Sequence, residues 1–161
     1  MEPSDLKIVV QSFVLAIIIF ISSFFALVPY VEYLVESFNC SVYGGDESYS
    51  ECISRSMDTW PHNYIIAAAR TLIEFVLALI FGFLFTKSYE QNRVKNLGML
   101  AFGTELFMAM PSFLETTSDF TTLFSFLLVF FTLFFGVFAG NSLEVKYSIT
   151  QSAMHKAREA S

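Results

Sequence analysis

Long runs of apolar residues alternate with short polar segments along the chain. Four runs, over residues 8–29, 64–85, 97–113 and 120–140, meet or approach the roughly 20 mostly apolar residues that a helix needs to cross a bilayer. They are too long for strands of a membrane barrel, which alternate over about 10 residues. The pattern predicts an all-α polytopic membrane protein, with one four-helix transmembrane bundle over residues 1–161.

The composition supports this class and excludes others. Of the 161 residues, 55% are hydrophobic and only 15% are charged, whereas about a quarter of the residues in soluble domains are charged. Disorder needs low hydrophobicity with high charge, and the apolar excess excludes it. The connections between the predicted spans are too short for a separate soluble domain of at least about 50 residues.

The basic residues predict the orientation of the bundle. Seven of the nine lie before the first span, between the second and third spans, or after the fourth: Lys7, Lys87, Arg93, Lys95, Lys146, Lys156 and Arg158. Short loops rich in lysine and arginine stay in the cytoplasm, so both termini are expected there, most simply at the plasma membrane. Residues 30–63, here called the outer segment, hold six acids against Arg55 alone. A nucleic-acid partner is not expected, because it requires a basic surface.

Both cysteines, Cys40 and Cys52, lie in the outer segment. A pair of loop cysteines on the oxidising side of a membrane favours a disulfide, and closing this loop contributes about 3 kcal/mol in the chain-entropy description. Residues 44–46, Gly-Gly-Asp, supply a turn between them. Free thiols or metal ligands are the alternatives, although two cysteines without a nearby histidine pair make a poor zinc site. We therefore expect a small disulfide-bridged outer loop.

Asn39 is a candidate glycosylation site. Asn39-Cys40-Ser41 fits the acceptor pattern and lies on the predicted outer side. The pattern is short and occurs often by chance, and a bridged Cys40 constrains the geometry at Asn39.

The first helix is expected to continue beyond the membrane. Val31, Leu34, Val35 and Phe38 recur at helical spacing after Pro29, which indicates an amphipathic extension. At the start of the second span, Trp60 suits the headgroup level of the bilayer.

Three ionisable residues lie within predicted spans: Arg70, Glu74 and Glu105. Ionisable groups inside a membrane cost several kcal/mol and usually face the interior of the bundle. Arg70 and Glu74 are four residues apart and share a helix face, and Glu105 lies within one or two turns of the same depth. One interpretation is a buried salt-bridge cluster that fixes helix packing. The other is a proton or cation relay.

Gly136 and Gly140 have the small-xxx-small spacing that lets two membrane helices approach closely. The fourth span holds eight phenylalanines and is aromatic nearly all round, which is typical of a surface that meets lipid or a partner subunit. No nucleophile elbow, phosphate loop or metal-binding Glu-x-x-His pair occurs. The sequence predicts neither an enzyme nor a bound metal or cofactor.

Four spans, two cysteines in the first outer segment and an arginine near the outer end of the second span resemble the claudin and peripheral-myelin-protein superfamily. The matching positions are Cys40, Cys52 and Arg70. The chain has Glu36-Ser37-Phe38 where that family has Gly-Leu-Trp, and its second outer loop, residues 114–119, is short. The resemblance implies a left-handed four-helix bundle with a disulfide-pinned extracellular sheet, and a role in junctions or as a channel accessory.

The sequence thus predicts a non-catalytic tetraspan protein whose partners are the lipid bilayer and other membrane subunits, or further copies of itself. It would act as an accessory, assembly or claudin-like packing subunit. A small oligomeric ion or proton channel built around Arg70, Glu74 and Glu105 is the alternative. A subunit of an energy-converting complex is a third hypothesis.

Overall fold

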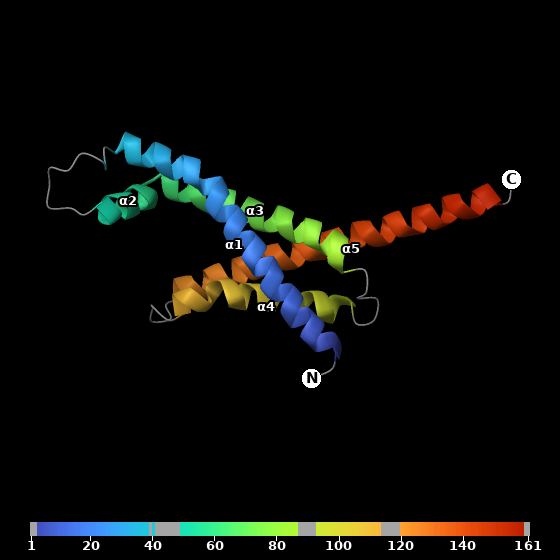
Figure 1. Ribbon diagram of the computed structural model, residues 1–161. Helices are drawn as coiled ribbons and strands as arrows, with labels where there is room; N and C mark the ends of the chain where they lie inside the picture. Colours follow the sequence, from blue (N-terminus) through green and yellow to red (C-terminus); the bar gives the residue numbers. More distant parts are fainter. Residues whose placement is uncertain (1–2, 39, 41–48, 87–92, 114–119, 160–161) are drawn as a thin grey trace. The chain divides into compact units, whose positions relative to one another are not determined.

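The computed structural model describes residues 3–38, 40, 49–86, 93–113 and 120–159 (Figure 1). All regular elements in these ranges are helices, and no strand occurs in them. The helices are α1 (Pro3–Ser37), α2 (Tyr49–Asp58), α3 (His62–Phe85), α4 (Arg93–Phe113) and α5 (Phe120–Glu159). The prediction of an all-α protein is confirmed over this part of the chain.

Three of the helices are long and apolar enough to cross a membrane. These stretches are Leu6–Ser37 in α1, His62–Phe85, which is the whole of α3, and Phe124–Met154 in α5. They contain or overlap the predicted spans 8–29, 64–85 and 120–140. Residues 97–113 are helical as part of α4, but α4 is not among these three stretches. The described part of the chain therefore contains three candidate spans, and the fourth stays a prediction.

Helix α1 continues through Pro29 and ends at Ser37, which confirms that the helix extends past the predicted span. That the extension lies beyond the membrane stays a prediction. The apolar side of the extension is covered, because Leu34 is fully buried. The backbone N–H of Phe38 donates to the Leu34 carbonyl oxygen over 2.9 Å, and that of Cys40 donates to the Val35 carbonyl oxygen over 3.0 Å. These bonds satisfy carbonyl groups that a helix end leaves without partners.

The outer segment is more helical than the predicted loop. After the end of α1, the chain forms α2, in which Tyr49, Ile53 and Met57 recur at four-residue spacing. Polar residues fill the other positions, and only Ser56 is buried. Residues 41–48, with the predicted turn at 44–46, lie outside the described part of the chain, as do residues 114–119. Residues 49–58 contain no apolar run, so the pattern of apolar runs along the chain does not indicate this helix.

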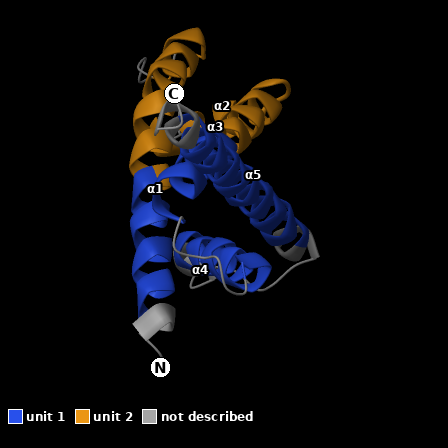
Figure 2. Ribbon diagram, turned by 90° about the vertical axis from the view of Figure 1, so that its right-hand side faces the viewer, with its two compact units in different colours: residues 1–18, 74–161 blue, residues 19–73 orange. Residues whose placement is uncertain are grey.

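The chain divides into two compact units (Figure 2). Unit 1 comprises residues 1–18 and 74–161, and unit 2 comprises residues 19–73. The boundaries fall inside α1 and α3, so each of these helices contributes one part to each unit. Unit 2 contains the extension of α1, the helix α2 and the beginning of α3, and its buried residues include Leu34, Cys40 and Ser56.

In unit 1, α4 packs against α5 in the antiparallel direction. The ring of Phe102 lies 6.0 Å from that of Phe126 and 6.4 Å from that of Phe130. Nine residues earlier on α4, Arg93 lies over the ring of Phe138, with 5.2 Å between the guanidinium carbon and the ring centroid. Residue numbers thus fall along α4 as they rise along α5. Leucines and small apolar residues fill the core of this unit: Leu15, Ala78, Leu97, Leu100, Ala101, Leu133 and Val137.

Helices α3 and α5 run parallel within unit 1. A Cβ atom added at Gly136 would lie 2.8 Å from the Cβ of Ala78, and one added at Gly140 would lie 2.8 Å from the backbone nitrogen of Phe83. Residue numbers therefore rise together on the two helices. Two parallel helices need a connection that brings the chain back to the starting end. Helix α4, which runs antiparallel to both, is that connection.

The first part of α1 contacts α4. The Ser12 hydroxyl donates to the Leu100 carbonyl oxygen over 3.1 Å, and both groups are buried. Opposite Ser12 stands Gly103, where an added Cβ would lie 2.7 Å from the Ser12 hydroxyl oxygen. Phe13 meets Phe107 edge to face, with ring centroids 5.3 Å apart. A small residue on α4 thus lets the polar side chain of α1 reach a backbone acceptor.

Candidate functional site

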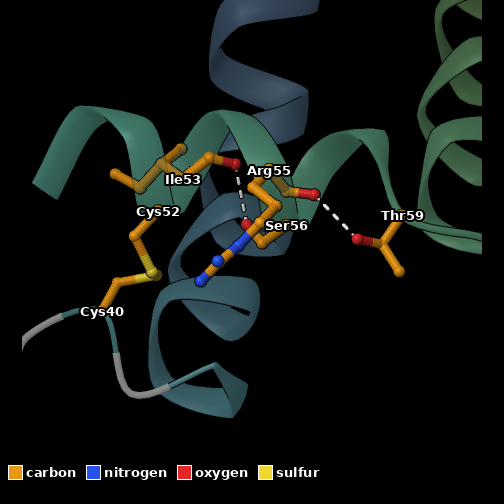
Figure 3. Close-up of a disulfide and its surroundings, with 6 residues drawn as sticks. All are labelled: Cys40, Cys52, Ile53, Arg55, Ser56 and Thr59. Carbon is orange, nitrogen blue, oxygen red and sulfur yellow. Dashed lines mark hydrogen bonds between the residues drawn. A yellow bond between two sulfur atoms is a disulfide. The ribbon is translucent and has the colours of Figure 1, made fainter. Parts of the chain in front are cut away.

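A disulfide joins the two predicted cysteines. Cys40 and Cys52 are bonded, their Cα atoms are 5.7 Å apart, and twelve positions separate them in sequence (Figure 3). Cys40 follows the last turn of α1, and Cys52 lies in the first half of α2. The disulfide therefore holds α2 to the end of α1. Two hydroxyls donate to backbone carbonyl oxygens of α2: that of Ser56 to Ile53, and that of Thr59 to Arg55.

In unit 2, α1 contacts the start of α3 in a way that the sequence pattern did not predict. The hydroxyl of Tyr30 and Nδ1 of His62 form a hydrogen bond of 2.7 Å. The ring of Phe38, directly after α1, meets the His62 ring edge to face with centroids 5.8 Å apart, and the Tyr30 ring lies 6.0 Å from it. The imidazole therefore has two aromatic neighbours. Tyr30 and His62 each flank a predicted span, and that position is the sequence signal for such a contact. Asn39, the candidate glycosylation site, lies outside the described residues.

Two carboxyl groups are buried inside unit 1. Glu74 on α3 is 1% exposed and Glu105 on α4 is 5% exposed. Arg70, on the part of α3 that belongs to unit 2, is exposed, in contrast to the interior position expected for it. The structure therefore gives the two carboxyls the same kind of environment and gives the arginine a different one. The three-residue cluster stays a prediction.

Glycines make the contact between α3 and α5 unusually close. The hydrogen of Gly140 faces the Leu79 carbonyl oxygen, and that of Gly82 faces the backbone of Val137, with 2.8 Å between an added Cβ and the Val137 Cα. An added Cβ at Gly136 would lie 2.9 Å from the Phe75 carbonyl oxygen. No larger residue fits these places unless a helix shifts. Gly136 and Gly140 thus lie at a helix contact, together with Gly82, which the spacing pattern did not include.

A group of polar side chains meets where α3 ends, α4 begins and the apolar run of α5 stops. We call it the polar end cluster: Thr86, Arg93, Asn141 and Ser142. The Asn141 amide nitrogen donates to the Thr86 carbonyl oxygen over 3.1 Å and to its hydroxyl over 2.8 Å. The Arg93 guanidinium donates to the Ser142 hydroxyl over 2.7 Å.

The sequence pattern did not predict the polar end cluster either. The Ser142 hydroxyl donates in turn to the Phe138 carbonyl oxygen over 2.7 Å, which fixes the acceptor that Arg93 uses. Asn141 is 3% exposed, and its carbonyl oxygen has no hydrogen-bond partner among the described residues. The sequence signal is the pair Asn141-Ser142 directly after Gly140, at the end of a long apolar run.

No group of three or more histidine, cysteine, aspartate or glutamate side chains that suits a metal ion occurs among the described residues. No protein family, curated protein or solved structure matches the chain. The likeness to the claudin superfamily therefore stays a prediction. The features that the structure offers for function are the buried carboxyls, the close helix contacts, the polar end cluster and the exposed aromatic surface of α5.

Proposed function

We propose that the chain is a non-catalytic, four-span membrane protein that packs laterally against other membrane subunits or further copies of itself. Its role is that of an accessory, assembly or claudin-like packing subunit. The observation that carries this proposal is a row of exposed aromatic side chains on α5.

The row lies on one face of the helix. Phe124, Leu128, Phe131 and Phe135 are spaced by three or four residues and are all exposed. The rings of Phe131 and Phe135 stack with centroids 6.4 Å apart, so the surface has a defined shape. Rigid aromatic side chains lose little conformational entropy when another protein covers them. Such a face suits a shape-matched protein surface better than the flexible acyl chains of lipids.

The packing of α4 supports a fourth span. It runs antiparallel to α5 from Arg93, opposite Phe138, to Phe102, opposite Phe126. Over this stretch α4 accompanies about 12 residues of a candidate span, or about 18 Å at 1.5 Å per residue. A helix that follows an apolar span for this distance enters the hydrocarbon region with it. Four crossings place both termini on one side, and the basic loops favour the cytoplasmic side.

Accessibility of the two termini tests the four-span topology. A small epitope tag is placed at either end of the full chain, and protease or antibody access is measured on sealed vesicles of one orientation. Both tags respond alike if α4 crosses the membrane. Opposite responses would mean that the chain crosses an odd number of times, and the topology would be wrong.

Association is tested by purification in mild detergent, with the mass of the particle measured by light scattering and mass spectrometry. We expect a particle heavier than the monomer, and the double variant Phe131→Ala/Phe135→Ala lowers its fraction. The control is Phe20→Ala/Phe25→Ala, which removes two exposed rings from α1. A monodisperse wild-type monomer, or equal loss in both variants, would contradict the proposed role of this face.

A second candidate function is favoured by one observation, the burial of Glu74 and Glu105 in the same unit. Buried carboxyls in membrane helices are common elements of proton and cation pathways. In this alternative, the protein is a small oligomeric channel or transporter, and the carboxyls bind the proton or cation in transit. Glu74→Gln and Glu105→Gln remove the charge with little change of volume.

Proton and cation flux into proteoliposomes tests the channel. Flux that disappears in both glutamine variants, but not in Arg70→Gln, would support it. Wild-type protein that remains folded and passes no ions above the lipid background would remove this alternative. The packing function would be unaffected by that result.

A further inference from the structure

The polar end cluster holds an arginine in an unusual position. Arg93 is the first residue of α4, yet its side chain lies against α5: it is over the Phe138 ring and donates to Ser142. Phe138 and Ser142 are one helical turn apart, so both contacts come from one face of α5. Two anchors on a neighbouring helix fix the guanidinium in place.

The anchors leave most of its hydrogen-bonding capacity available. A guanidinium has five N–H donors and no acceptor, and Ser142 accepts from one nitrogen. The buried Nε of Arg93 has no hydrogen-bond partner among the described residues. A guanidinium that is fixed in place and has donors to spare is well suited to bind an acceptor group of opposite charge, and a phosphate matches its geometry.

Further cations lie around Arg93. Lys146 follows Ser142 by one turn, so it continues the face of α5 formed by Phe138 and Ser142, and its side chain is exposed. Lys95, two residues after Arg93, is exposed on another side of α4. On α1, Lys7 lies one turn before Gln11, whose side-chain amide donates to the Phe85 carbonyl oxygen at the end of α3 over 3.2 Å. Of these cations, Lys146 continues the face of α5 that holds Arg93, and Lys7 lies on a helix that contacts the end of α3.

Among the described residues, two acids lie close in sequence to these cations: Asp5, two residues before Lys7, and Glu144, two residues before Lys146. The four cations therefore outnumber the two acids in this part of unit 1. The region also coincides with the place where α3 ends and where the apolar run of α5 gives way to Asn141 and Ser142. At such a boundary between hydrocarbon and water, the available phosphate groups belong to lipid headgroups.

We propose that Arg93, together with Lys146 one turn beyond Ser142 on α5, binds the phosphate of an anionic phospholipid headgroup. Basic pockets between membrane helices have the charge and depth to hold such headgroups. Zwitterionic phosphatidylcholine also has a phosphate, but its choline cation faces the same basic side chains and is disfavoured. The inference needs only the helix boundary and holds for either orientation and for either proposed function.

Native mass spectrometry of the full chain tests the proposal. The protein is released from micelles that contain equal amounts of phosphatidylglycerol and phosphatidylcholine, and the ratio of the two bound lipids is measured. We expect phosphatidylglycerol to be retained in preference, and Arg93→Gln and Lys146→Gln each to lower that preference by about fivefold, the factor that corresponds to about 1 kcal/mol per basic residue. The matched control is Arg55→Gln in unit 2, which leaves the ratio unchanged.

Equal retention of the two lipids by the wild type, or an unchanged ratio in Lys146→Gln and Arg93→Gln, would overturn the proposal. Because Lys146 is exposed, its variant keeps the test valid if Arg93→Gln does not fold. A final measurement adds inorganic phosphate at millimolar concentration. If the lipid stays bound, the result supports a lipid headgroup as the ligand. If inorganic phosphate displaces the lipid, the site binds free phosphate and the proposed lipid site is wrong.

Discussion

Gly140 of α5 lies directly against the backbone of Leu79 in α3, with the glycine hydrogen facing the leucine carbonyl oxygen. The two helices run parallel, and Gly136 makes the preceding contact one turn earlier. Dispersion between closely spaced backbones stabilises helix pairs in membranes, where the hydrophobic effect contributes little. The contact therefore fixes the distance between two of the candidate spans.

Gly140→Ala is expected to destabilise the protein by about 1–3 kcal/mol, the usual cost of overpacking a closed contact. The added Cβ would also lie 2.8 Å from the Phe83 backbone nitrogen, and backbone atoms cannot turn away. Unfolding in detergent with increasing denaturant measures the effect. Gly98→Ala is the control, since the nearest atom to its added Cβ is 3.9 Å away; that change is neutral or stabilising. Equal losses in both variants would contradict the contact.

Asn141 and Thr86 are expected to be energetically coupled. The amide of Asn141 donates to two atoms of Thr86 in a buried place, and side-chain hydrogen bonds between membrane helices contribute roughly 0.6 to 2 kcal/mol. A double-mutant cycle with Asn141→Leu and Thr86→Val should give a coupling energy in that range. Thr132→Val is the control, because its exposed hydroxyl bonds only within its own helix. If the losses of unfolding free energy in the two single variants are strictly additive, the hydrogen bond between the two side chains contributes nothing to stability.

Loss of the Cys40–Cys52 bond is expected to lower the free energy of unfolding by about 3 kcal/mol, because the open chain gains entropy when unfolded. The variant Cys40→Ser/Cys52→Ser and reduction of the wild type should give the same shift in thermal unfolding. The chain has two cysteines in total, so reducing agent should leave the double variant unchanged. A wild type that melts at the same temperature before and after reduction would show that the bond does not stabilise unit 2.

Trp60 is the single tryptophan of the chain and is 75% exposed, two residues before α3 begins. Indole rings favour the headgroup level of bilayers, so its fluorescence should be quenched more strongly by lipids brominated near the headgroup than by lipids brominated near the chain end. Trp60→Phe gives the background. Quenching by aqueous iodide as efficient as that of free tryptophan would place the ring in water instead.

Apolar run length was sufficient to predict α1, α3 and α5. Each run has roughly the length of a bilayer crossing, and helix formation is the only way for one segment to satisfy its own backbone in lipid. The extension of α1 beyond Pro29 could be predicted because Leu34 and its neighbours repeat at helical spacing. The Cys40–Cys52 pairing could be predicted because the chain has one possible pair.

The sequence alone did not predict the polar helix α2 or the contacts between residues far apart in the chain. The composition of residues 49–58 is polar and does not distinguish α2 from a loop. A disulfide to the residue after α1 holds this helix in place, and composition does not reveal that constraint. Arg70 and Glu74 share a helix face by spacing, yet one is exposed and the other buried. Burial depends on which neighbouring helix covers each side chain, and a single sequence does not contain that information.

The sequence by itself determined that the chain is helical, that it is built for a membrane and where its disulfide forms. These properties follow from local chemistry: run length, periodicity and the presence of two cysteines. The tertiary structure decided that Gly140 meets Leu79, that Tyr30 bonds to His62 and that Arg93 is held against α5. Each of these contacts joins residues at least 32 positions apart, so it depends on the relative direction and height of two helices, which only the folded chain sets.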